Sequence, residues 1–275
     1  MPEGPEIRLA ADRLHAAMAG RVAVEVQFTL DHLQSYAPAL SGETITAVKA
    51  RSKAMLVNFA NGLTIYSHNQ LYGRWYVRPA RDYPDTNRQL RIAIHNQQKS
   101  ALLYSATDIA VLAEAELADH PYLRKLGPEL LEPETTVAEV AARFRDRRFR
   151  RRRLDTLLLD QGFLAGMGNY LRSETLFVAR VKPTARPAEC DDDQVRQLAD
   201  AALSLTRRSY RTKGITNDPA LADYLRQAGY PRRDQRFWVF GRDGAPCHIC
   251  STAILKTRLS GRRLYYCPRC QPAPQ

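Results

Sequence analysis

The chain has 275 residues, of which 44% are hydrophobic, and it carries a formal net charge of +12. The apolar fraction excludes a disordered chain, and the length suits about two domains with a small additional module. The positive charge favours a polyanionic partner. Nucleic acid is favoured over a membrane because no apolar run approaches the roughly 18 residues that span a bilayer. Glu3 and Glu6 stand where a secretory signal would be basic, so a reducing, cytoplasmic location is expected.

The first 130 residues combine one helix with many short strands. Pro5 suits a first helical residue and Gly20 suits the end of that helix, with apolar residues at helical spacing between them. Residues 22–28 alternate between apolar and polar, which predicts a half-buried strand. Further strands are predicted at 44–48, 55–59, 63–67, 75–77, 90–95 and 101–104. Many short strands separated by turns indicate a β-sandwich or barrel-like domain over residues 1–130.

Helical patterns dominate the middle of the chain. Glycines and prolines at 127–133 predict a linker, and Thr136 and Glu139 have the spacing of a capping box. Helices are expected at 154–161, 170–178 and 195–205, which gives a helical domain over 134–212. Residues 213–236 are highly charged without clear periodicity, and we expect a loop-rich connection there.

Four of the five cysteines lie near the C-terminus in two CxxC pairs separated by 16 residues. This spacing is typical of two zinc knuckles that hold one structural Zn²⁺, because two such turns can place four thiolates around one ion. Strands at 253–258 and 263–266, with Ser260-Gly261 at the tip, predict a zinc-finger hairpin within residues 237–275. The four expected ligands are Cys247, Cys250, Cys267 and Cys270.

Three other interpretations of these residues are weaker. A redox pair is disfavoured because two CxxC motifs occur together in a chain expected in a reducing compartment. His248 could replace one ligand, but four cysteines already suffice. Cys190 stands outside the pattern and is interpreted as an incidental thiol.

Two segments of the middle region suit a phosphate partner. Residues 143–153 read RFRDRRFRRRR, and even if this run is an ordinary solvated face it attracts phosphate without recognising sequence. Residues 161–170 read QGFLAGMGNY, with three glycines that interrupt the helical pattern. This segment is either a tight connection between helices or a turn that grips a DNA phosphate, with Asn169 capping the next helix.

The chain starts with PEGPEI, residues 66–73 read YSHNQLYG, and residues 162–174 read GFLAGMGNYLRSE. Together with the four-cysteine hairpin, these motifs resemble the formamidopyrimidine-DNA glycosylase/endonuclease VIII family over essentially the whole chain. The segment at 66–73 is similar to the endonuclease VIII branch, which acts on oxidised pyrimidines. The resemblance implies an α+β multidomain fold, with an N-terminal helix plus β-sandwich, a helix–two-turn–helix domain and a C-terminal zinc-finger β-hairpin.

The resemblance also implies the catalytic residues of a bifunctional DNA glycosylase/AP lyase of base excision repair. Pro2 would be the nucleophile and would form a Schiff base once Met1 is removed. Glu3 would be the acid that opens the deoxyribose ring. Lys53 would contact the backbone at the lesion and assist proton transfer, and Arg262 would serve the final elimination step.

Further positions match residues of the family that bind damaged or abasic double-stranded DNA. Gln70, Leu71 and Tyr72 match the loop that fills the space left by an extruded nucleotide. Lys125 matches a basic DNA-contacting position, and Asn169 matches the asparagine that grips a phosphate. The resemblance implies one structural Zn²⁺, β,δ-elimination, no membrane partner and a monomer.

Three departures from the family pattern qualify these roles. Lys125 stands where arginine is expected, which keeps the charge but loses bidentate geometry. Arg263 follows Arg262, so either arginine could reach the phosphate. The connection 213–236 is longer than expected. Two alternatives stay open: the same chemistry on oxidised purines, and a non-catalytic zinc-dependent nucleic-acid-binding protein.

Overall fold

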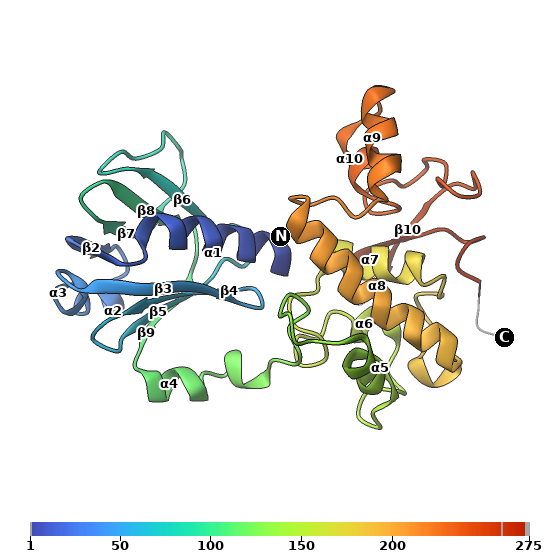
Figure 1. Cartoon of the computed structure of the whole chain (residues 1–275), viewed down its shortest axis with the longest axis horizontal. Helices are drawn as coiled ribbons and strands as arrows, with labels where there is room; N and C mark the ends of the chain where they lie inside the picture. The colour runs from blue at the N-terminus through green and yellow to red at the C-terminus, as the bar shows by residue number, and fades with distance from the viewer. Residues whose placement is uncertain (1, 260, 273–275) are drawn as a thin grey trace. The chain divides into compact units, whose positions relative to one another are not determined.

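Figure 1 shows the computed structural model of the chain, which describes residues 2–259 and 261–272. The chain divides into two compact units, Met1–Lys125 and Leu126–Gln275. Each unit has a hydrophobic core of its own. No helix in the described part of the chain is long and apolar enough to cross a membrane.

The first unit is a sandwich of two antiparallel sheets. One sheet has the strand order β1-β3-β4-β5-β9 and the other the order β2-β7-β8-β6. Inward-facing residues of both sheets form one core between them. The strands are β1 (Arg21–Val22), β2 (Glu25–Phe28), β3 (Thr44–Arg51), β4 (Ala54–Phe59), β5 (Thr64–His68), β6 (Arg74–Pro79), β7 (Leu90–His95), β8 (Lys99–Tyr104) and β9 (Asp108–Leu112).

Helix α1 (Gly4–Met18) closes this sandwich, and Figure 1 shows it running between β3 of one sheet and β6 and β8 of the other. Its apolar stripe, including Ile7 and Leu14, joins the core. The outer face of the first sheet is covered by α4 (Glu114–Asp119) and the short η1 (Leu123–Lys125). Two short helices, α2 (Asp31–Gln34) and α3 (Ala37–Leu40), complete the unit.

The single strand expected at residues 22–28 is wrong in one respect. The alternation is real, but the chain changes sheets at Ala23 and Val24, so that β1 pairs with β3 and β2 pairs with β7. Ala23 is fixed by two backbone bonds, its N–H to the Glu43 carbonyl and its carbonyl to the Gly42 N–H. The alternation of apolar and polar residues continues through the change of sheet, so the sequence pattern does not reveal that the strand is divided.

The second unit is mainly helical. Its helices are α5 (Val137–Arg145), α6 (Leu154–Leu157), α7 (Asn169–Val178), η2 (Pro187–Glu189), α8 (Asp192–Arg211), α9 (Pro219–Gln227) and α10 (Arg232–Arg236). The predicted cap of α5 is confirmed, since Thr136 Oγ1 accepts a hydrogen bond from the Glu139 N–H at 3.1 Å. The helix predicted at 154–161 is shorter than expected and ends at Leu157.

The loop-rich connection predicted at 213–236 is also wrong, because it contains α9 and α10. Asp218 Oδ1 accepts hydrogen bonds from the N–H groups of Ala220 and Leu221, and Pro219 occupies the first helical position. An aspartate cap followed by proline is a helix start. The two helices pack on each other and stand together in Figure 1.

The C-terminal hairpin forms as predicted. Strands β10 (Leu255–Leu259) and β11 (Arg262–Tyr266) pair antiparallel, with Leu259 opposite Arg262. Ser260, expected at the tip, lies outside the described residues. The hairpin belongs to the same compact unit as the helices, because β11 packs on α7.

Candidate functional site

Pro2 and Glu3 directly precede α1. Pro2 is half-buried, and the Glu3 side chain is 3% exposed. The Glu3 backbone N–H donates to Glu6 Oε2 at 2.9 Å, which fixes the entry of the chain into the first helical turn. The two residues therefore lie at the positive end of the α1 dipole, where cationic groups are disfavoured.

Lys53 lies in the two-residue turn between β3 and β4. Ser52, the first residue of this turn, has a φ of 59°, as a tight hairpin requires. Lys53 is only 8% exposed. Lysine side chains are rarely buried unless their charge is paired. Tyr122 holds the turn, because its hydroxyl accepts a bond from the Lys53 N–H at 3.3 Å and donates to Ser52 Oγ at 3.1 Å.

The loop that contains Gln70, Leu71 and Tyr72 joins β5 to β6. In the sheet, Ala54 pairs with His68, so the loop begins beside the turn that contains Lys53. Leu71 is 53% exposed and Tyr72 is 66% exposed. The first unit thus places a buried lysine beside the start of a loop that exposes two large apolar side chains.

Backbone geometry fixes the shape of this loop. The Gly73 N–H donates to the Asn69 carbonyl at 2.7 Å, and a Cβ at Gly73 would lie 2.6 Å from that oxygen. Gln70 has a φ of 49°, and its Oε1 accepts a bond from Thr107 Oγ1 at 2.9 Å. The close approach explains why the loop ends in glycine.

His68 is the last residue of β5, directly before the loop, and the charge of Lys53 acts on it. Burial lowers the pKa of His68, the charge of Lys53 lowers it further, and Asp108 opposes both effects. The ring is therefore neutral at pH 7. Its Nδ1 accepts a hydrogen bond from the Gln70 N–H at 3.0 Å.

In the second unit, the glycine-rich segment forms the turn that leads into α7. Gln161 fills this turn: its Nε2 donates to the Met167 carbonyl at 3.0 Å and its Oε1 accepts from the Gly166 N–H at 3.0 Å. The expected cap is wrong by one residue, because Gly168 is the N-cap and Asn169 is the first residue of α7. Asn169 is half-buried at this helix end.

Arg172 connects Asn169 to the hairpin. Its guanidinium is fully buried and donates to the Asp155 carbonyl at 2.6 Å and to the Arg263 carbonyl at 2.9 Å. It also reaches Asn169 Oδ1 at 3.4 Å. One buried side chain therefore brings the start of α7 and strand β11 together.

Glu174 connects the other side of α7 to the segment that precedes the hairpin. Its carboxylate is fully buried and accepts from the N–H groups of Trp238, Val239 and Phe240 at 2.8 to 2.9 Å. The Thr216 hydroxyl donates to it at 2.6 Å. Such a carboxylate fixes three consecutive backbone groups that would otherwise be buried without partners.

Arg262, Arg263 and Lys125 are exposed. Arg262 and Arg263 are adjacent in β11, so their side chains leave opposite faces of the strand. Lys125 is the last residue of η1 and of the first unit.

The four predicted cysteine ligands come together. Their sulfur atoms all lie within 4.8 Å of one another, and three of the sulfur–sulfur separations are 3.4 Å, 3.5 Å and 3.9 Å. A tetrahedral Zn²⁺ with Zn–S distances of about 2.3 Å needs sulfur separations of about 3.8 Å, so the residues fit this ion. The N–H groups of Ile249 and Cys270 point at the first sulfur of each CxxC pair.

The remaining titratable candidates stand outside this cluster. His248 is not part of the four-residue group. Cys190 is buried, its thiol donates to the Arg186 carbonyl at 3.5 Å, and burial raises its pKa to about 11.

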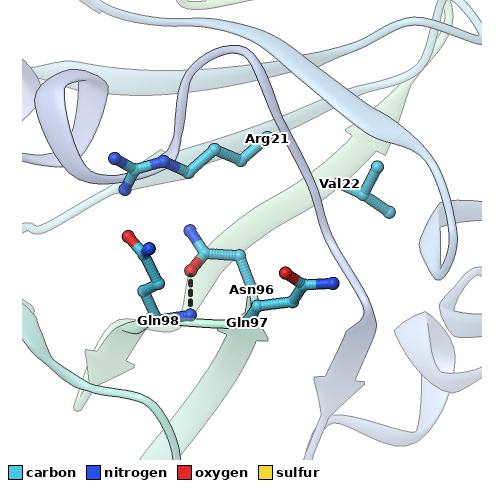
Figure 2. Close-up of a pocket in the computed structure, with 5 residues that line it drawn as sticks. All are labelled: Arg21, Val22, Asn96, Gln97 and Gln98. Carbon is cyan, nitrogen blue, oxygen red and sulfur yellow. Dashed lines mark hydrogen bonds between the residues drawn. The ribbon is translucent and has the colours of Figure 1, made fainter.

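A polar pocket of about 330 Å³ lies elsewhere in the first unit (Figure 2). It is lined by Arg21, Val22, Asn96, Gln97 and Gln98, none of them a predicted site residue. Arg21 Nη1 donates to the Ala17 carbonyl at the end of α1, and Asn96 Oδ1 accepts from the Gln98 and Lys99 N–H groups. These polar groups form hydrogen bonds that hold the end of α1 and the turn between β7 and β8.

Sequence reasoning missed three residues that support the site: Tyr122, Arg172 and Glu174. A signal existed for two of them, because Arg172 and Glu174 are charged residues between the apolar Leu171 and Leu176 of one helix. Charged residues at such positions are buried only when they are paired. No local signal distinguishes Tyr122, whose partner Lys53 is 69 residues away.

Comparisons with known proteins agree with these motifs. Three family models match: the formamidopyrimidine-DNA glycosylase N-terminal domain at residues 1–107, the formamidopyrimidine-DNA glycosylase H2TH domain at 126–219, and the zinc finger found in FPG and IleRS at 244–273. Endonuclease 8 of Klebsiella pneumoniae subsp. pneumoniae is 45% identical, with 98% of this chain and 100% of the relative covered. Endonuclease 8 of Salmonella arizonae is 43% identical over the same shares.

Solved structures share the fold. Lactococcus lactis formamidopyrimidine-DNA glycosylase bound to DNA containing an AP site has a TM-score of 0.80 at 18% identity, with 98% of this chain and 99% of that chain covered. MutM in complex with DNA containing carbocyclic 8-oxo-G also has a TM-score of 0.80 at 18% identity, with 98% and 100% covered.

Proposed function

The chain belongs to the family of formamidopyrimidine-DNA glycosylases and endonuclease 8 enzymes, and we propose that it removes oxidised pyrimidines through a Schiff base on Pro2. Its membership makes it a DNA N-glycosylase and AP lyase of base excision repair. The pyrimidine preference is supported by the contiguous loop of Gln70, Leu71 and Tyr72. The partner is double-stranded DNA with a damaged base or an abasic site.

Pro2 is the nucleophile, and removal of Met1 frees its secondary amine. An α-amino group has a reference pKa near 7.7–8.0, against about 10.4 for lysine, so more of it is unprotonated at pH 7. Proline is more basic than that average, but the adjacent positive end of α1 favours the neutral amine. A secondary amine also gives an iminium that stays charged because it has no N–H to lose.

The reaction then proceeds in successive steps. The Pro2 nitrogen attacks C1′ while the N-glycosidic bond breaks, and the base leaves with the electron pair and a proton. The C1′–O4′ bond then breaks as O4′ takes a proton, and the nitrogen lone pair forms the iminium. The iminium acidifies the C2′ proton, whose removal expels the 3′ phosphate by β-elimination. A second, δ-elimination expels the 5′ phosphate and leaves a one-nucleotide gap with phosphate at both ends.

Glu3 and Lys53 move protons beside this nitrogen. Glu3 supplies the carboxyl that protonates the ring oxygen and opens the deoxyribose. Lys53 binds the backbone at the lesion and assists the transfer, and its buried position suits a lysine used for proton transfer. Arg262 serves the final elimination by binding a phosphate oxygen.

The loop occupies the duplex after the damaged nucleotide leaves the stack. A base must be extruded before its C1′ can be attacked. Leu71 and Tyr72 are exposed apolar side chains that can fill the resulting space. Gln70 pairs with the orphaned base, while Asn169 and Lys125 bind backbone phosphates.

One structural Zn²⁺ holds the C-terminal hairpin. Cys247, Cys250, Cys267 and Cys270 bind it, and the ion adds to the hydrophobic packing of the hairpin against α7. We expect the enzyme to act as a monomer.

The observation that carries this proposal is the placement of Pro2 and Glu3 at the start of α1, in the same unit as the buried Lys53 and the exposed loop beside it. The test is borohydride trapping on a duplex with an abasic site, combined with intact-mass analysis. We expect a covalent adduct only with protein that has lost Met1. A variant with an N-terminal extension should bind DNA but form no adduct, and trapping by that variant would exclude Pro2.

Substrate preference needs a separate measurement. We expect faster cleavage of duplexes that contain thymine glycol than of duplexes that contain 8-oxoguanine. A strong preference for 8-oxoguanine would contradict the pyrimidine assignment without affecting Pro2. A non-catalytic binding protein would give no adduct with either abasic or damaged DNA.

A further inference from the structure

The arginine-rich run at 143–153 contains two kinds of side chain. Five of its eight arginines are engaged within the protein. Arg143 donates to the Phe163 carbonyl at 2.8 Å and to the Gly162 carbonyl at 2.5 Å. The other engaged arginines pair with carboxylates: Arg145 with Asp192, Arg148 with Asp146, Arg152 with Asp160 and Arg153 with Asp155.

The other three arginines, Arg147, Arg150 and Arg151, are exposed. None of these three side chains makes a hydrogen bond or ion pair with another described residue. Three unpaired guanidinium groups within five residues repel one another. Because these three side chains are exposed and do not pack in the core, they contribute little to the stability of the fold.

A second basic segment lies beside them. The Ala188 N–H donates to the Arg150 carbonyl at 2.9 Å, and the Leu154 N–H donates to the Ala185 carbonyl at 2.8 Å. The segment 182–188 therefore runs alongside residues 150–154. It contributes the exposed side chains of Lys182 and Arg186. We call Arg147, Arg150, Arg151, Lys182 and Arg186 the basic patch.

The acidic residues of the run do not neutralise this patch. Asp146 is held by Arg148, whose hydrogen bonds lower the pKa of the carboxyl to about 2. Asp155 is buried against Arg153. These two carboxylates are matched by other arginines. Glu189 lies at the edge of the patch, where its Oε2 accepts from the Arg186 N–H at 2.9 Å, and five basic side chains against this one carboxylate leave the patch positive.

The run that holds the patch is bonded to the glycine-rich turn that leads to Asn169. Arg152 pairs with Asp160, and Asp160 Oδ1 accepts a bond from the Gly162 N–H at 2.8 Å. Arg143 binds the carbonyls of the same turn. These bonded arginines join the run that holds the patch to the turn that leads to the proposed phosphate-binding end of α7.

We propose that the basic patch binds the phosphate backbone of the DNA duplex that flanks the lesion, as a second contact beyond the one at Asn169. This inference rests on the proposed action on duplex DNA. A duplex presents one negative charge per about 1.7 Å of its axis, and binding of arginines to phosphates releases counterions. Arginine suits this partner because its planar fork binds phosphate oxygens in pairs.

The test measures the salt dependence of binding. The variant replaces Arg147→Gln, Arg150→Gln and Arg151→Gln together, and the probe is a duplex with a tetrahydrofuran abasic analogue. Affinity is measured between about 50 and 200 mM KCl for a duplex of about 12 base pairs and one of about 30, roughly one and three helical turns. Each phosphate contact contributes about 0.9 to the slope of log K against log salt concentration.

We expect the variant to lose about 2 to 3 units of slope on the long duplex and less than about 1 unit on the short duplex. The matched control, Arg13→Gln with Arg196→Gln and Arg226→Gln, removes the same charge from exposed positions elsewhere. It should change the slopes for the two duplexes by equal, small amounts. Thermal midpoints of both variants should match the unmodified protein.

Two results would contradict the proposal that the basic patch binds DNA phosphates. An unchanged slope on the long duplex would mean that the three arginines touch no phosphate, as would be the case if they bound an acidic protein surface. An equal loss on both duplexes would place the contact at the lesion. Borohydride trapping on the short duplex should persist in the variant, so failure of the patch and failure of Pro2 catalysis are distinguishable.

Discussion

The position of the buried Lys53 depends on a residue that is far away in the sequence. Tyr122 lies at the end of the first unit, and its hydroxyl bridges the Lys53 N–H and Ser52 Oγ. Pro2, Lys53 and Leu71 could be proposed as site residues from the sequence because each belongs to a short local motif. Tyr122 could not, since its role exists only when the chain brings β4 and η1 together.

We expect Tyr122→Phe to weaken catalysis more than binding. The substitution removes one hydroxyl while the ring keeps its contact with His68 at 5.2 Å. The loss of such bonds costs about 0.5–1.5 kcal/mol each, which should slow borohydride trapping several-fold. The affinity for a tetrahydrofuran duplex should stay the same, and an equal loss of affinity would contradict a role in positioning Lys53. Tyr36→Phe, at an exposed position, is the matched control.

The exposed pair Leu71 and Tyr72 should matter for duplex DNA only. Leu71→Ala with Tyr72→Ala removes side chains that touch little of the folded protein, so the thermal midpoint should not change. We expect on the order of a tenfold loss in kcat/KM for a damaged base in a duplex, or about 1.4 kcal/mol of barrier. Trapping on a single-stranded abasic oligonucleotide should be unaffected, because no stack has to be opened.

At the scale of elements, helix α7 organises the second unit. Arg172 and Glu174 are two residues apart, and they bind backbone groups of β11 and of residues 238–240 respectively. The sequence predicts the helix well, within one residue at its start. It does not predict which backbone groups its buried charges reach, because those partners lie more than 60 residues away.

We expect Glu174→Gln to destabilise the second unit. The amide group replaces one acceptor oxygen by a donor, which faces N–H groups that it cannot satisfy. A buried donor without a partner costs about 1–3 kcal/mol. The measurement is the thermal midpoint together with hydrogen exchange at residues 237–240, which should lose protection. Glu139→Gln, on an exposed face of α5, should change neither quantity.

The connection at 213–236 shows where periodicity fails at this scale. Helices α9 and α10 have 9 and 5 residues, too short for a clear apolar stripe to appear among so many charges. The start of α9 was nevertheless encoded by Asp218 and Pro219. Local capping chemistry predicts such short helices better than periodicity does.

Across the whole molecule, the sequence motifs predict the order of the sandwich, the helical region and the hairpin along the chain. They do not predict how the hairpin packs on the helices. The sequence separates a helical domain from a zinc hairpin by composition. In the structure both belong to one compact unit, Leu126–Gln275, because Leu264 of β11 joins the core formed by the helices. The apolar residues of a hairpin carry no signal of which core they enter.

Removal of the metal should therefore destabilise the whole second unit and not the hairpin alone. We expect calorimetry to show two transitions, one for each unit, since each has its own core. A zinc chelator, or Cys250→Ser, should lower the transition of the second unit by several degrees and leave the first in place, and DNA binding should weaken. Restoration of the midpoint by added Zn²⁺ is the control. A midpoint that does not respond to chelation would contradict a structural metal.

The buried thiol of Cys190 has a practical consequence for spectroscopy. A pKa of about 11 keeps it protonated at neutral pH, and protonated thiols do not react with maleimides. The other four cysteines are assigned to zinc. A single new cysteine at an exposed position, such as Gln227→Cys at the end of α9, should then be the only reactive thiol. A fluorophore could therefore be attached there without removal of any native cysteine.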